Sequence, residues 1–332
     1  MEGRDPDPTV AGDPGISTLG EVLDPVTART YLGQALSDHV RAIEDIRFDI
    51  LKHHPGKRCT LNISVRTPDG WRALIGKVYA EDRPDVYGAM RELTRAGFGP
   101  EEAMGIPQPI AYVPALRLLL QENIDGPRAK EIFLTGDERD RAEASARSAR
   151  WLAKFHAIAP RSGAVLDPLD ELEAAERWSR TIAGLAGPFP GQARTLFRRL
   201  EEEAPSASAS ERCAGHGSYN CNQIILTKDR TITFDWDGHD VADPGRDVAR
   251  FIVALERLAF KYLGSIRALD AAADVFLRTY QALSPFEVSA NLSWYRALTC
   301  LRLAKYEAHR PVCTLRAGIE ALLGEGVRVL ER

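Results

Sequence analysis

Three short segments in the second half of the sequence contain side chains that could do chemistry. They are residues 216–226 (HGSYNCNQIIL), 234–237 (FDWD) and 242–249 (ADPGRDVA). Their acids, amides, hydroxyl and histidine are side-chain types that bind metal ions or move protons. A loop followed by a hairpin can bring residues this far apart in the sequence close together in space, so we expect the three segments to form one site.

A simpler interpretation of these segments is that they carry no function. A His-Gly pair occurs by chance in many chains, and an Asp-Trp-Asp sequence can be a solvated turn. Against this, the three segments lie close together, between residues 216 and 249, and flank predicted strands. We therefore favour a functional site.

The chain before Gly126 is predicted to be rich in strands. Residues 58–65 roughly alternate polar and apolar side chains, a Pro-Asp-Gly turn follows, and residues 71–79 form a second strand-like run. This pattern predicts a β-hairpin. Two further strands are expected at residues 107–113 and 116–121.

Two helices are predicted among these strands. Asp24 is a good N-cap and Pro25 fits the first position of a short helix that reaches about Leu36. A second helix is expected over residues 85–96. Its predicted inner face consists of four apolar residues: Val86, Ala89, Met90 and Leu93.

Helical patterns dominate after Gly126. The predicted helices cover residues 138–158, 171–182, 191–203 and the chain from 247 to the end. The low-complexity segment 204–210 must be a loop. Residues 223–226 and 231–234 are predicted as two short strands around the turn at residues 228–230.

The fold class predicted from these elements is α+β, with a β-rich N-terminal lobe and a mainly helical C-terminal lobe. Residues 1–16 are rich in Gly, Pro and Asp and are expected to be a disordered tail. The predicted lobes are residues 17–122 and 123–332.

Composition excludes several classes of protein. The net charge of −4 does not indicate a nucleic-acid partner, and a weakly acidic surface fits cationic or neutral substrates. There is no apolar run of about 18 residues, so no membrane span is expected, and the N-terminus lacks the apolar segment of a signal peptide. The five widely spread cysteines argue against disulfides and zinc, and indicate reduced thiols in the cytoplasm.

The three segments resemble the motifs of the aminoglycoside phosphotransferase and choline kinase family. The family pattern is His-Gly-Asp, four residues, Asn-Ile-Leu, then a strand ending in Ile-Asp-Trp or Ile-Asp-Phe, then Asp-Pro-x-x-Asp-Leu-Ala. The resemblance implies a bilobal protein-kinase-like fold that binds ATP and Mg²⁺. Phosphoryl transfer of this kind needs metal ions to neutralise the phosphates and a group to orient the attacking hydroxyl.

The resemblance assigns roles to five residues of the motif. It makes His216 a structural histidine of the catalytic loop and Asp235 the magnesium-binding aspartate, which also counts among the catalytic residues. Asp237 could help with catalysis and with a second metal ion. Asp243 and Asp247 match structural aspartates, and the last of these usually braces the catalytic loop in the family.

Two positions depart from the family pattern. Ser218 stands at the catalytic aspartate, and Gln223 stands at the metal-binding asparagine. Glutamine keeps a carbonyl ligand for the metal, but serine cannot act as a general base at neutral pH, and such a base contributes roughly 10²–10⁴-fold to the rate. The substitution therefore predicts a slow enzyme, a base relocated to Asp237 or Asp240, or a nucleotide binder without catalysis.

The resemblance also implies ATP-binding residues in the first lobe. Lys57 and Arg58 lie in the turn where protein kinases keep the phosphate-binding loop, although an ordinary basic turn fits as well. Lys77 lies in an apolar strand, where a buried ammonium needs a partner. In this family that partner is phosphate together with a helix glutamate, and Glu92 is the natural candidate; the alternative is that both side chains face solvent.

The strand and hinge that receive adenine are expected at Gln121, Glu122, Asn123 and Ile124, mainly through main-chain groups. Two histidines outside the motif, His156 and His239, are interpreted as structural or without a role.

The function predicted by the resemblance is ATP- and Mg-dependent transfer of phosphate to a hydroxyl. The acceptor is a small molecule (an antibiotic, amino alcohol or sugar) or a Ser or Thr of a biosynthetic peptide. The alternative is a pseudokinase, a nucleotide-binding regulatory or partner subunit in which Ser218 has ended phosphotransfer. A weaker alternative is transfer of a nucleotidyl group. No nucleic-acid or membrane partner is expected.

Overall fold

The computed structural model describes residues 12–38, 40, 42–206, 211–308 and 315–331. The chain forms two compact units, residues 1–125 and 126–332, so the division falls three residues after the predicted one. Most of the predicted tail lies outside the described residues. At its end, however, the Asp13 carboxylate accepts a 2.8 Å hydrogen bond from the Gly56 N–H and Ile16 is buried, so these two residues belong to the folded unit.

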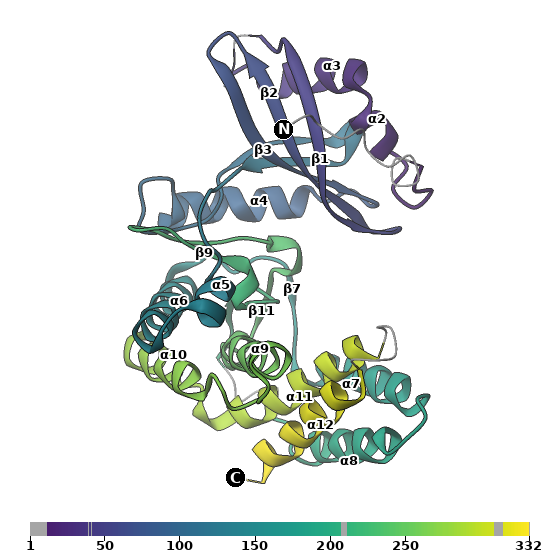
Figure 1. The fold of residues 1–332 in the computed structure, drawn as a ribbon, viewed down its shortest axis with the longest axis vertical. Coiled ribbons are helices and arrows are strands. Elements are labelled where there is room, and N and C mark those ends of the chain that lie inside the picture. Colours follow the sequence, from purple (N-terminus) through teal and green to yellow (C-terminus); the bar gives the residue numbers. More distant parts are fainter. Residues whose placement is uncertain (1–11, 39, 41, 207–210, 309–314, 332) are drawn as a thin grey trace. The chain divides into compact units, whose positions relative to one another are not determined.

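The first unit is built on a five-stranded antiparallel sheet (Figure 1). Its strand order is β1-β2-β3-β6-β5. The predicted hairpin is confirmed, because the β2–β3 pairing runs without interruption from Arg58 and Tyr79 to Thr67 and Gly70. The strands of this unit are β1 (Asp45–His54), β2 (Arg58–Thr67), β3 (Gly70–Tyr79), β4 (Met104–Gly105), β5 (Pro109–Val113) and β6 (Leu118–Glu122).

Strand β1 was not predicted, and its pattern explains why. Only Ile46 and Phe48 are buried, whereas Leu51 is 56% exposed, so the alternation fades after the middle of the strand. The register also shifts between Ile50 and Lys52. β1 is an edge strand with an irregularity, and such strands lack a clean period of two.

The helices of the first unit agree with the patterns that predicted them. Asp24 caps α3 by accepting a 2.8 Å hydrogen bond from the Thr27 N–H, and Pro25 is its first residue. All four predicted inner residues of α4 are buried. The helices are α2 (Leu19–Leu23), α3 (Pro25–Ala35) and α4 (Pro84–Leu93), with a π-helical turn at Thr94–Phe98 and a 3₁₀ turn at Pro114–Leu116.

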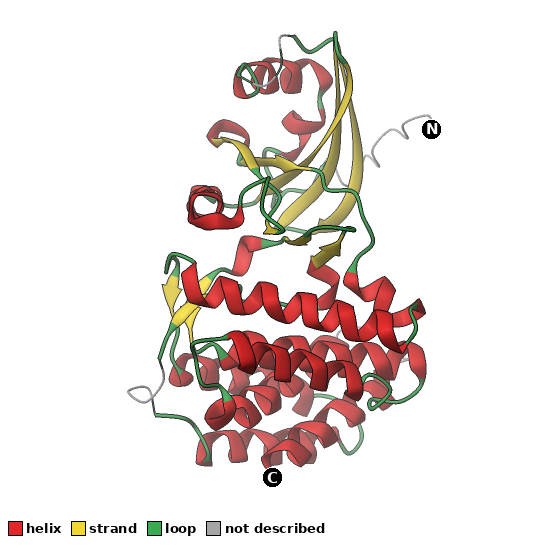
Figure 2. Cartoon of the chain, turned by 90° about the vertical axis from the view of Figure 1, so that its left-hand side faces the viewer, coloured by secondary structure: helices red, strands yellow, loops and turns green. Residues whose placement is uncertain are grey.

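The second unit is mostly helical (Figure 2). The long helix predicted at residues 138–158 has those bounds, and Asp137 and Asp140 form a capping box at its start. The predicted loop at 204–210 lies largely outside the described residues. The helices are α5 (Ala129–Thr135), α6 (Glu138–Ile158), α7 (Pro168–Ala183), α8 (Phe189–Glu202), α9 (Gly245–Leu263), α10 (Asp270–Leu283), α11 (Ser289–Glu307) and α12 (Leu315–Leu330).

Short strands of the second unit hold the three chemical segments. β9 (Ile224–Leu226) and β10 (Thr231–Thr233) form the predicted hairpin. β11 (Asp240–Ala242) lies between β8 (Cys213–Gly215) and β7 (Ala164–Val165) in a second small sheet. The first segment therefore follows β8, the second follows β10, and the third begins at the end of β11.

An aromatic core fixes these segments between α6 and α9. The ring of Trp151 on α6 lies 5.7 Å from that of Tyr219 and 5.9 Å from that of Trp236. Tyr219 also contacts Phe251 on α9, with ring centroids 5.6 Å apart, and its hydroxyl donates to the Ser148 carbonyl. The segments are thus anchored from both sides by large buried rings.

Among the residues that the structure describes, no helix has both the length and the apolarity needed to cross a membrane.

We predict that Trp151→Ala lowers the free energy of unfolding by about 3–5 kcal/mol, because it empties a fully buried site in this core. Trp71→Ala is the matched control. Its ring is 45% exposed under the Arg47 guanidinium, so the loss should be about 1 kcal/mol or less. Urea unfolding followed by circular dichroism measures both, and equal losses would contradict the central place of Trp151.

Candidate active site

The first chemical segment begins with a buried histidine that is held on both sides. The His216 backbone N–H donates to the Asp247 carboxylate at 2.6 Å, and the ring Nε2 lies 3.1 Å from the Phe234 carbonyl oxygen. Burial lowers the pKa of His216, although Asp247 and Asp235 oppose this. A neutral ring that donates from Nε2 leaves Nδ1 as an acceptor. These contacts fit the structural role predicted for His216 and the bracing role predicted for Asp247.

The next residue must be a glycine. Gly217 has φ +77°, and a Cβ placed there would overlap the carbonyl oxygen of Gly238. The Gly217 carbonyl accepts a hydrogen bond from the Arg250 guanidinium. The loop can therefore turn closely over the segment after β10 only because no side chain stands at this position.

Ser218, Gln223 and Asp235 form one hydrogen-bonded chain. The Gln223 amide nitrogen donates to Ser218 Oγ at 2.9 Å and to Asp235 Oδ2 at 3.2 Å. Ser218 Oγ also lies 3.4 Å from the His216 Nδ1 acceptor. Sequence analysis missed Asn220, whose amide nitrogen contacts both the Ser218 carbonyl and Gln223 Oε1. The structure thus brings together the serine, the amide and the acid of the predicted site.

The backbone at Asp235 is unusual. Its φ is +76°, in the left-handed region that few residues other than glycine, asparagine and aspartate adopt. Strained positions of this kind occur preferentially at functional sites, where the surrounding structure imposes them. Here the strained residue is the acid that the resemblance assigns to metal binding.

Gln223 and Asp235 are a donor set that fits a magnesium ion. Half a turn of the Gln223 amide would bring its carbonyl oxygen to within about 3 Å of Asp235 Oδ2, where its nitrogen now lies. Neighbouring ligands of an octahedral Mg²⁺ have this spacing, since each lies about 2.1 Å from the ion. No group of three His, Cys, Asp or Glu in the described part of the chain could hold a metal, so an ion bound here would need phosphate and water oxygens as further ligands.

The two candidates for a relocated base differ. Asp237 is half-buried in the 3₁₀ turn Trp236–Gly238. Asp240 is buried and accepts a hydrogen bond from Arg246, and burial raises its pKa even though Arg246 opposes this. Its carboxylate is paired with Arg246 inside the fold, whereas Asp237 is partly exposed, so Asp237 is the more accessible of the two candidates.

The third segment is a structural anchor. Asp243 accepts from the Gly245 N–H at 2.7 Å and from the Asn291 amide at 2.8 Å. Burial by itself would raise the pKa of Asp247, but the neighbouring His156, whose Nε2 lies 3.7 Å away, and the charge of Arg250 hold that pKa well below its usual value. Asp247 is therefore a charged brace inside the unit.

Sequence analysis gave Arg246 no role, and the structure supplies one. Its guanidinium lies 2.5 Å from Glu171 on α7 and contacts Asp240 on β11. The three side chains are each at least nine-tenths buried. A charged residue at the start of a largely apolar helix was the available signal, because a buried charge must be paired.

The remaining predicted residues lie on the first unit. Lys57 is exposed in the turn between β1 and β2, and Arg58 begins β2. The Gly56 N–H of this turn donates to the Asp13 carboxylate, which also lies 2.8 Å from His53 Nε2. Asp13 thus already accepts a hydrogen bond from one backbone N–H of the predicted phosphate loop. The two basic side chains remain candidates for phosphate binding.

Lys77 is 5% exposed on β3, opposite Leu119 of β6, which excludes a solvent-facing position. Glu92 lies on the exposed side of α4, and no ion pair joins it to another residue in the described ranges. Its pairing with Lys77 stays a prediction. Gln121 is buried at the end of β6, and Glu122, Asn123 and Ile124 follow it half-buried, as a hinge would require.

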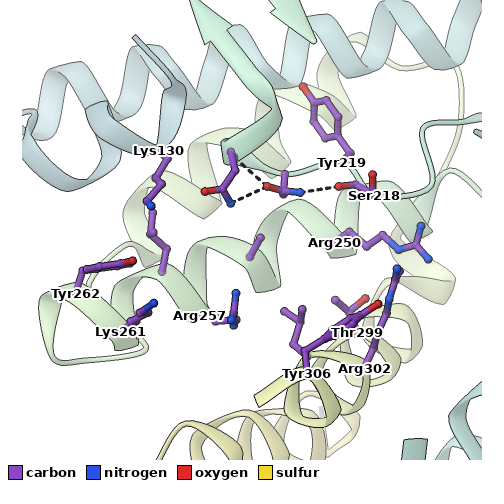
Figure 3. Close-up of a pocket in the computed structure, with 15 residues that line it drawn as sticks. Lys130, Ser218, Tyr219, Arg250, Arg257, Lys261, Tyr262, Thr299, Arg302 and Tyr306 are labelled. Carbon is purple, nitrogen blue, oxygen red and sulfur yellow. Dashed lines mark hydrogen bonds between the residues drawn. The ribbon is translucent and has the colours of Figure 1, made fainter. Parts of the chain in front are cut away.

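A pocket of about 390 Å³ opens beside Ser218 within the second unit (Figure 3). Ser218, Tyr219, Asn220 and Asn222 line it from the segment after β8. The rest of its wall comes from α5, α9 and α11 and includes five cationic side chains: Lys130, Arg250, Arg257, Lys261 and Arg302. Sequence analysis missed these residues because they are scattered over three helices and form no local motif.

We predict that Gly217→Ala destabilises the loop by about 2–4 kcal/mol, through its left-handed backbone and the overlap with Gly238. The facing Gly238 is the control. A Cβ there meets its nearest neighbour at 3.8 Å, so Gly238→Ala should be almost neutral. Urea unfolding separates the two variants, and a stable Gly217→Ala protein would show that the loop is not built as described.

Comparisons with known proteins agree with this geometry. Residues 67–301 match the model of the phosphotransferase enzyme family APH. No curated protein matches the chain in sequence. Several solved structures are similar in fold although only 14–15% identical.

A choline/ethanolamine kinase family protein from Mesorhizobium loti is 15% identical, with a TM-score of 0.61 over 92% of this chain and 94% of that one. The choline kinase LicA of Streptococcus pneumoniae is 14% identical, with a TM-score of 0.59 over 92% and 99%. The macrolide 2′-phosphotransferase MphH of Brachybacterium faecium is 15% identical, with a TM-score of 0.52 over 88% and 97%. The chain has a kinase-like α+β fold and belongs to the APH phosphotransferase family.

Proposed function

We propose that this protein is an ATP- and Mg-dependent phosphotransferase that acts on a hydroxyl of a small molecule. The observation that carries the proposal is the grouping of Ser218, Gln223 and Asp235, in which the Gln223 amide nitrogen lies 2.9 Å from Ser218 Oγ and 3.2 Å from Asp235 Oδ2. It joins the position of the acceptor hydroxyl to a magnesium donor set, and the acid in that set has a strained backbone. Membership of the phosphotransferase family supports the same activity.

In this proposal, each residue has one task. Asp235 and Gln223 hold the magnesium ion, which neutralises phosphate charge when it is bound with ATP. Lys77, Lys57 and Arg58 bind phosphates, with Glu92 as a partner of Lys77. Main-chain groups at residues 121–124 receive the adenine.

Ser218 orients the acceptor hydroxyl in place of the usual aspartate. The acceptor oxygen bonds to the γ-phosphorus, the bond from that phosphorus to the ADP oxygen breaks, and the hydroxyl proton leaves to water or to Asp237. Serine cannot take this proton at neutral pH. Phosphoryl transfer nevertheless depends mainly on positioning and charge stabilisation, because its transition state is loose. A serine at this position therefore permits catalysis at a reduced rate.

The second candidate function is that of a pseudokinase that binds nucleotide without phosphotransfer. The observation that favours it is that Ser218 Oγ already contacts two side chains of the protein, Gln223 and His216. A hydroxyl so engaged is less free to orient an acceptor.

We propose the cytoplasm as the location. The four described cysteines, Cys59, Cys213, Cys221 and Cys300, are buried and unpaired, which fits a reducing compartment.

The first test is binding of Mg-ATP. We expect a concentration of about 100 times Kd to raise the melting temperature by roughly 5–10 °C. Asp235→Asn should lose the part of this shift that depends on magnesium, since asparagine tolerates the left-handed backbone but carries no charge. Asp229→Asn, on the exposed turn after β9, is the control and should behave like the wild type. A wild-type protein whose melting temperature does not respond to Mg-ATP would contradict both candidate functions.

The second test is Ser218→Asp, which decides between enzyme and pseudokinase. We expect the wild type to release ADP with a suitable acceptor, and Ser218→Asp to lower that rate at least about tenfold, because the variant lacks the serine hydroxyl that accepts from Gln223 and orients the acceptor in this site. ADP release is measured with a panel of hydroxyl compounds, and Ser218→Ala shows the effect of losing the hydroxyl alone. Activity that appears only in Ser218→Asp would establish the pseudokinase.

A further inference from the structure

The charged side chains that line the pocket beside Ser218 are all positive. Five of its fifteen lining residues are cationic, and none is an aspartate or glutamate. Figure 3 shows Lys130, Arg257 and Arg302 around the same hollow as Ser218. The whole chain, by contrast, has a net charge of −4. The pocket therefore concentrates positive charge on a protein that is weakly acidic.

Two of the five cations are held by contacts within the protein. Arg257 Nε donates to Glu307 at 2.7 Å, and Arg250 donates to the Gly217 carbonyl. The other three are Lys130, Lys261 and Arg302. In the part of the chain that the structure describes, no carboxylate lies within 4 Å of these three.

Aromatic rings orient the three uncompensated cations. Lys130 Nζ and Lys261 Nζ lie 5.2 and 4.9 Å from the ring centre of Tyr262. The Arg302 guanidinium lies 5.9 Å from the ring centre of Tyr306. Both rings line the pocket, so each cation is held at its wall without being neutralised.

Titratable groups in the wall respond to this positive field. The neighbouring ammonium groups of Lys261 and Lys130 lower the pKa of Tyr262. Burial would raise the pKa of Tyr306, but Arg302 and Lys305 bring it below its usual value. Burial, together with repulsion from Arg246 and Arg302, lowers the pKa of Arg250 to about 9.

We propose that the acceptor of this phosphotransferase is an anion, a small hydroxylated molecule that carries a carboxylate or phosphate group. The proposal rests on the proposed function for the phosphoryl transfer itself. Lys130, Lys261 and Arg302 bind the anionic group, and the acceptor hydroxyl lies at Ser218. The weakly acidic composition of the chain fits cationic or neutral substrates, whereas the local charge of the pocket favours an anionic one.

The serine at position 218 has a physical reason in this arrangement. An aspartate there would put a negative charge on the wall of the pocket, where it would repel an anionic acceptor. Serine removes that charge and keeps a hydroxyl that can hydrogen-bond the substrate. The serine at position 218 and the cationic side chains of the pocket thus both favour an anionic acceptor.

The test measures binding of simple ions to the full chain without nucleotide or magnesium, at constant ionic strength. The probes are inorganic phosphate, citrate, glucose and choline, and calorimetry measures each Kd. We expect binding of phosphate or citrate, and no detectable binding of glucose or choline. Tighter binding of phosphate identifies a phosphate-bearing acceptor, and tighter binding of citrate a carboxylate. Choline binding as tight as that of either anion would overturn the proposal.

Matched charge variants locate the binding. The pocket variant combines Lys130→Gln, Lys261→Gln and Arg302→Gln, and the control combines Lys228→Gln, Arg194→Gln and Arg278→Gln, which are exposed elsewhere on the same unit. Each removes three positive charges. We expect the pocket variant to weaken anion binding about 100-fold and the control about twofold or less, since hydrogen bonds from charged donors are strong. Equal effects would overturn the proposal.

Two further measurements distinguish a failure of the anionic-acceptor proposal from a failure of the proposed phosphotransferase function. Lys261 is exposed, so Lys261→Gln alone cannot disturb folding, and it should still weaken anion binding about tenfold. Mg-ATP binding is measured on the pocket variant as well. Retained Mg-ATP binding with lost anion binding supports an anionic acceptor. Loss of both would place nucleotide phosphates in this pocket and overturn the proposal, while leaving the proposed function standing.

Discussion

The hydrogen bond from the His216 N–H to the Asp247 carboxylate is the interaction on which the site depends. It joins the end of β8 to the start of α9 at 2.6 Å, inside a region without solvent. A buried carboxylate loses its hydration, so it is stable as an anion only if neighbouring groups stabilise its charge. Here His156 on α6 and Arg250 on α9 lie close to Asp247 and do so. Once this contact is fixed, Gly217 must turn over Gly238, and Ser218, Gln223 and Asp235 follow in their places.

This arrangement divides the loop between two tasks. On one side, Gln223 and Asp235 present oxygen donors of the kind that magnesium prefers. On the other side, Ser218, Asn220 and Asn222 line the cationic pocket. Ser218 belongs to both sides through its hydrogen bond to Gln223, so its substitution for an acid changes the acceptor side while the metal donors stay in place. The serine is therefore compatible with catalysis on a suitable substrate.

Much of the fold could be predicted because its signals are local. The capped start of α3 at Asp24, the four inner residues of α4 and the bounds of α6 all follow from helix periodicity and capping. The β2–β3 hairpin follows from its alternation and its turn. β1 escaped prediction because an irregular edge strand has no such period. The motif residues were found because they lie within about 35 positions of one another.

The rest of the site could not be predicted, because it depends on packing between distant segments. Lys130, Lys261 and Arg302 look like ordinary surface cations in the sequence, and only the packing of α5, α9 and α11 brings them to one pocket. Arg246 and Glu171 are likewise 75 positions apart and meet only in the folded unit. The charge of the pocket could not be predicted for the same reason, since the net charge of −4 is a sum over the whole chain and gives no information about the side chains that line one pocket.

Bound metal at Gln223 and Asp235 can be measured directly. Mn²⁺ can replace Mg²⁺ at an oxygen site and is observed by electron paramagnetic resonance. With a non-hydrolysable ATP analogue present, we expect bound Mn²⁺ in the wild-type protein and a clear loss of it when the Gln223 carbonyl is removed by Gln223→Leu. Bound Mn²⁺ that is unchanged in Gln223→Leu, or absent from the wild type, would show that these residues do not form a magnesium site.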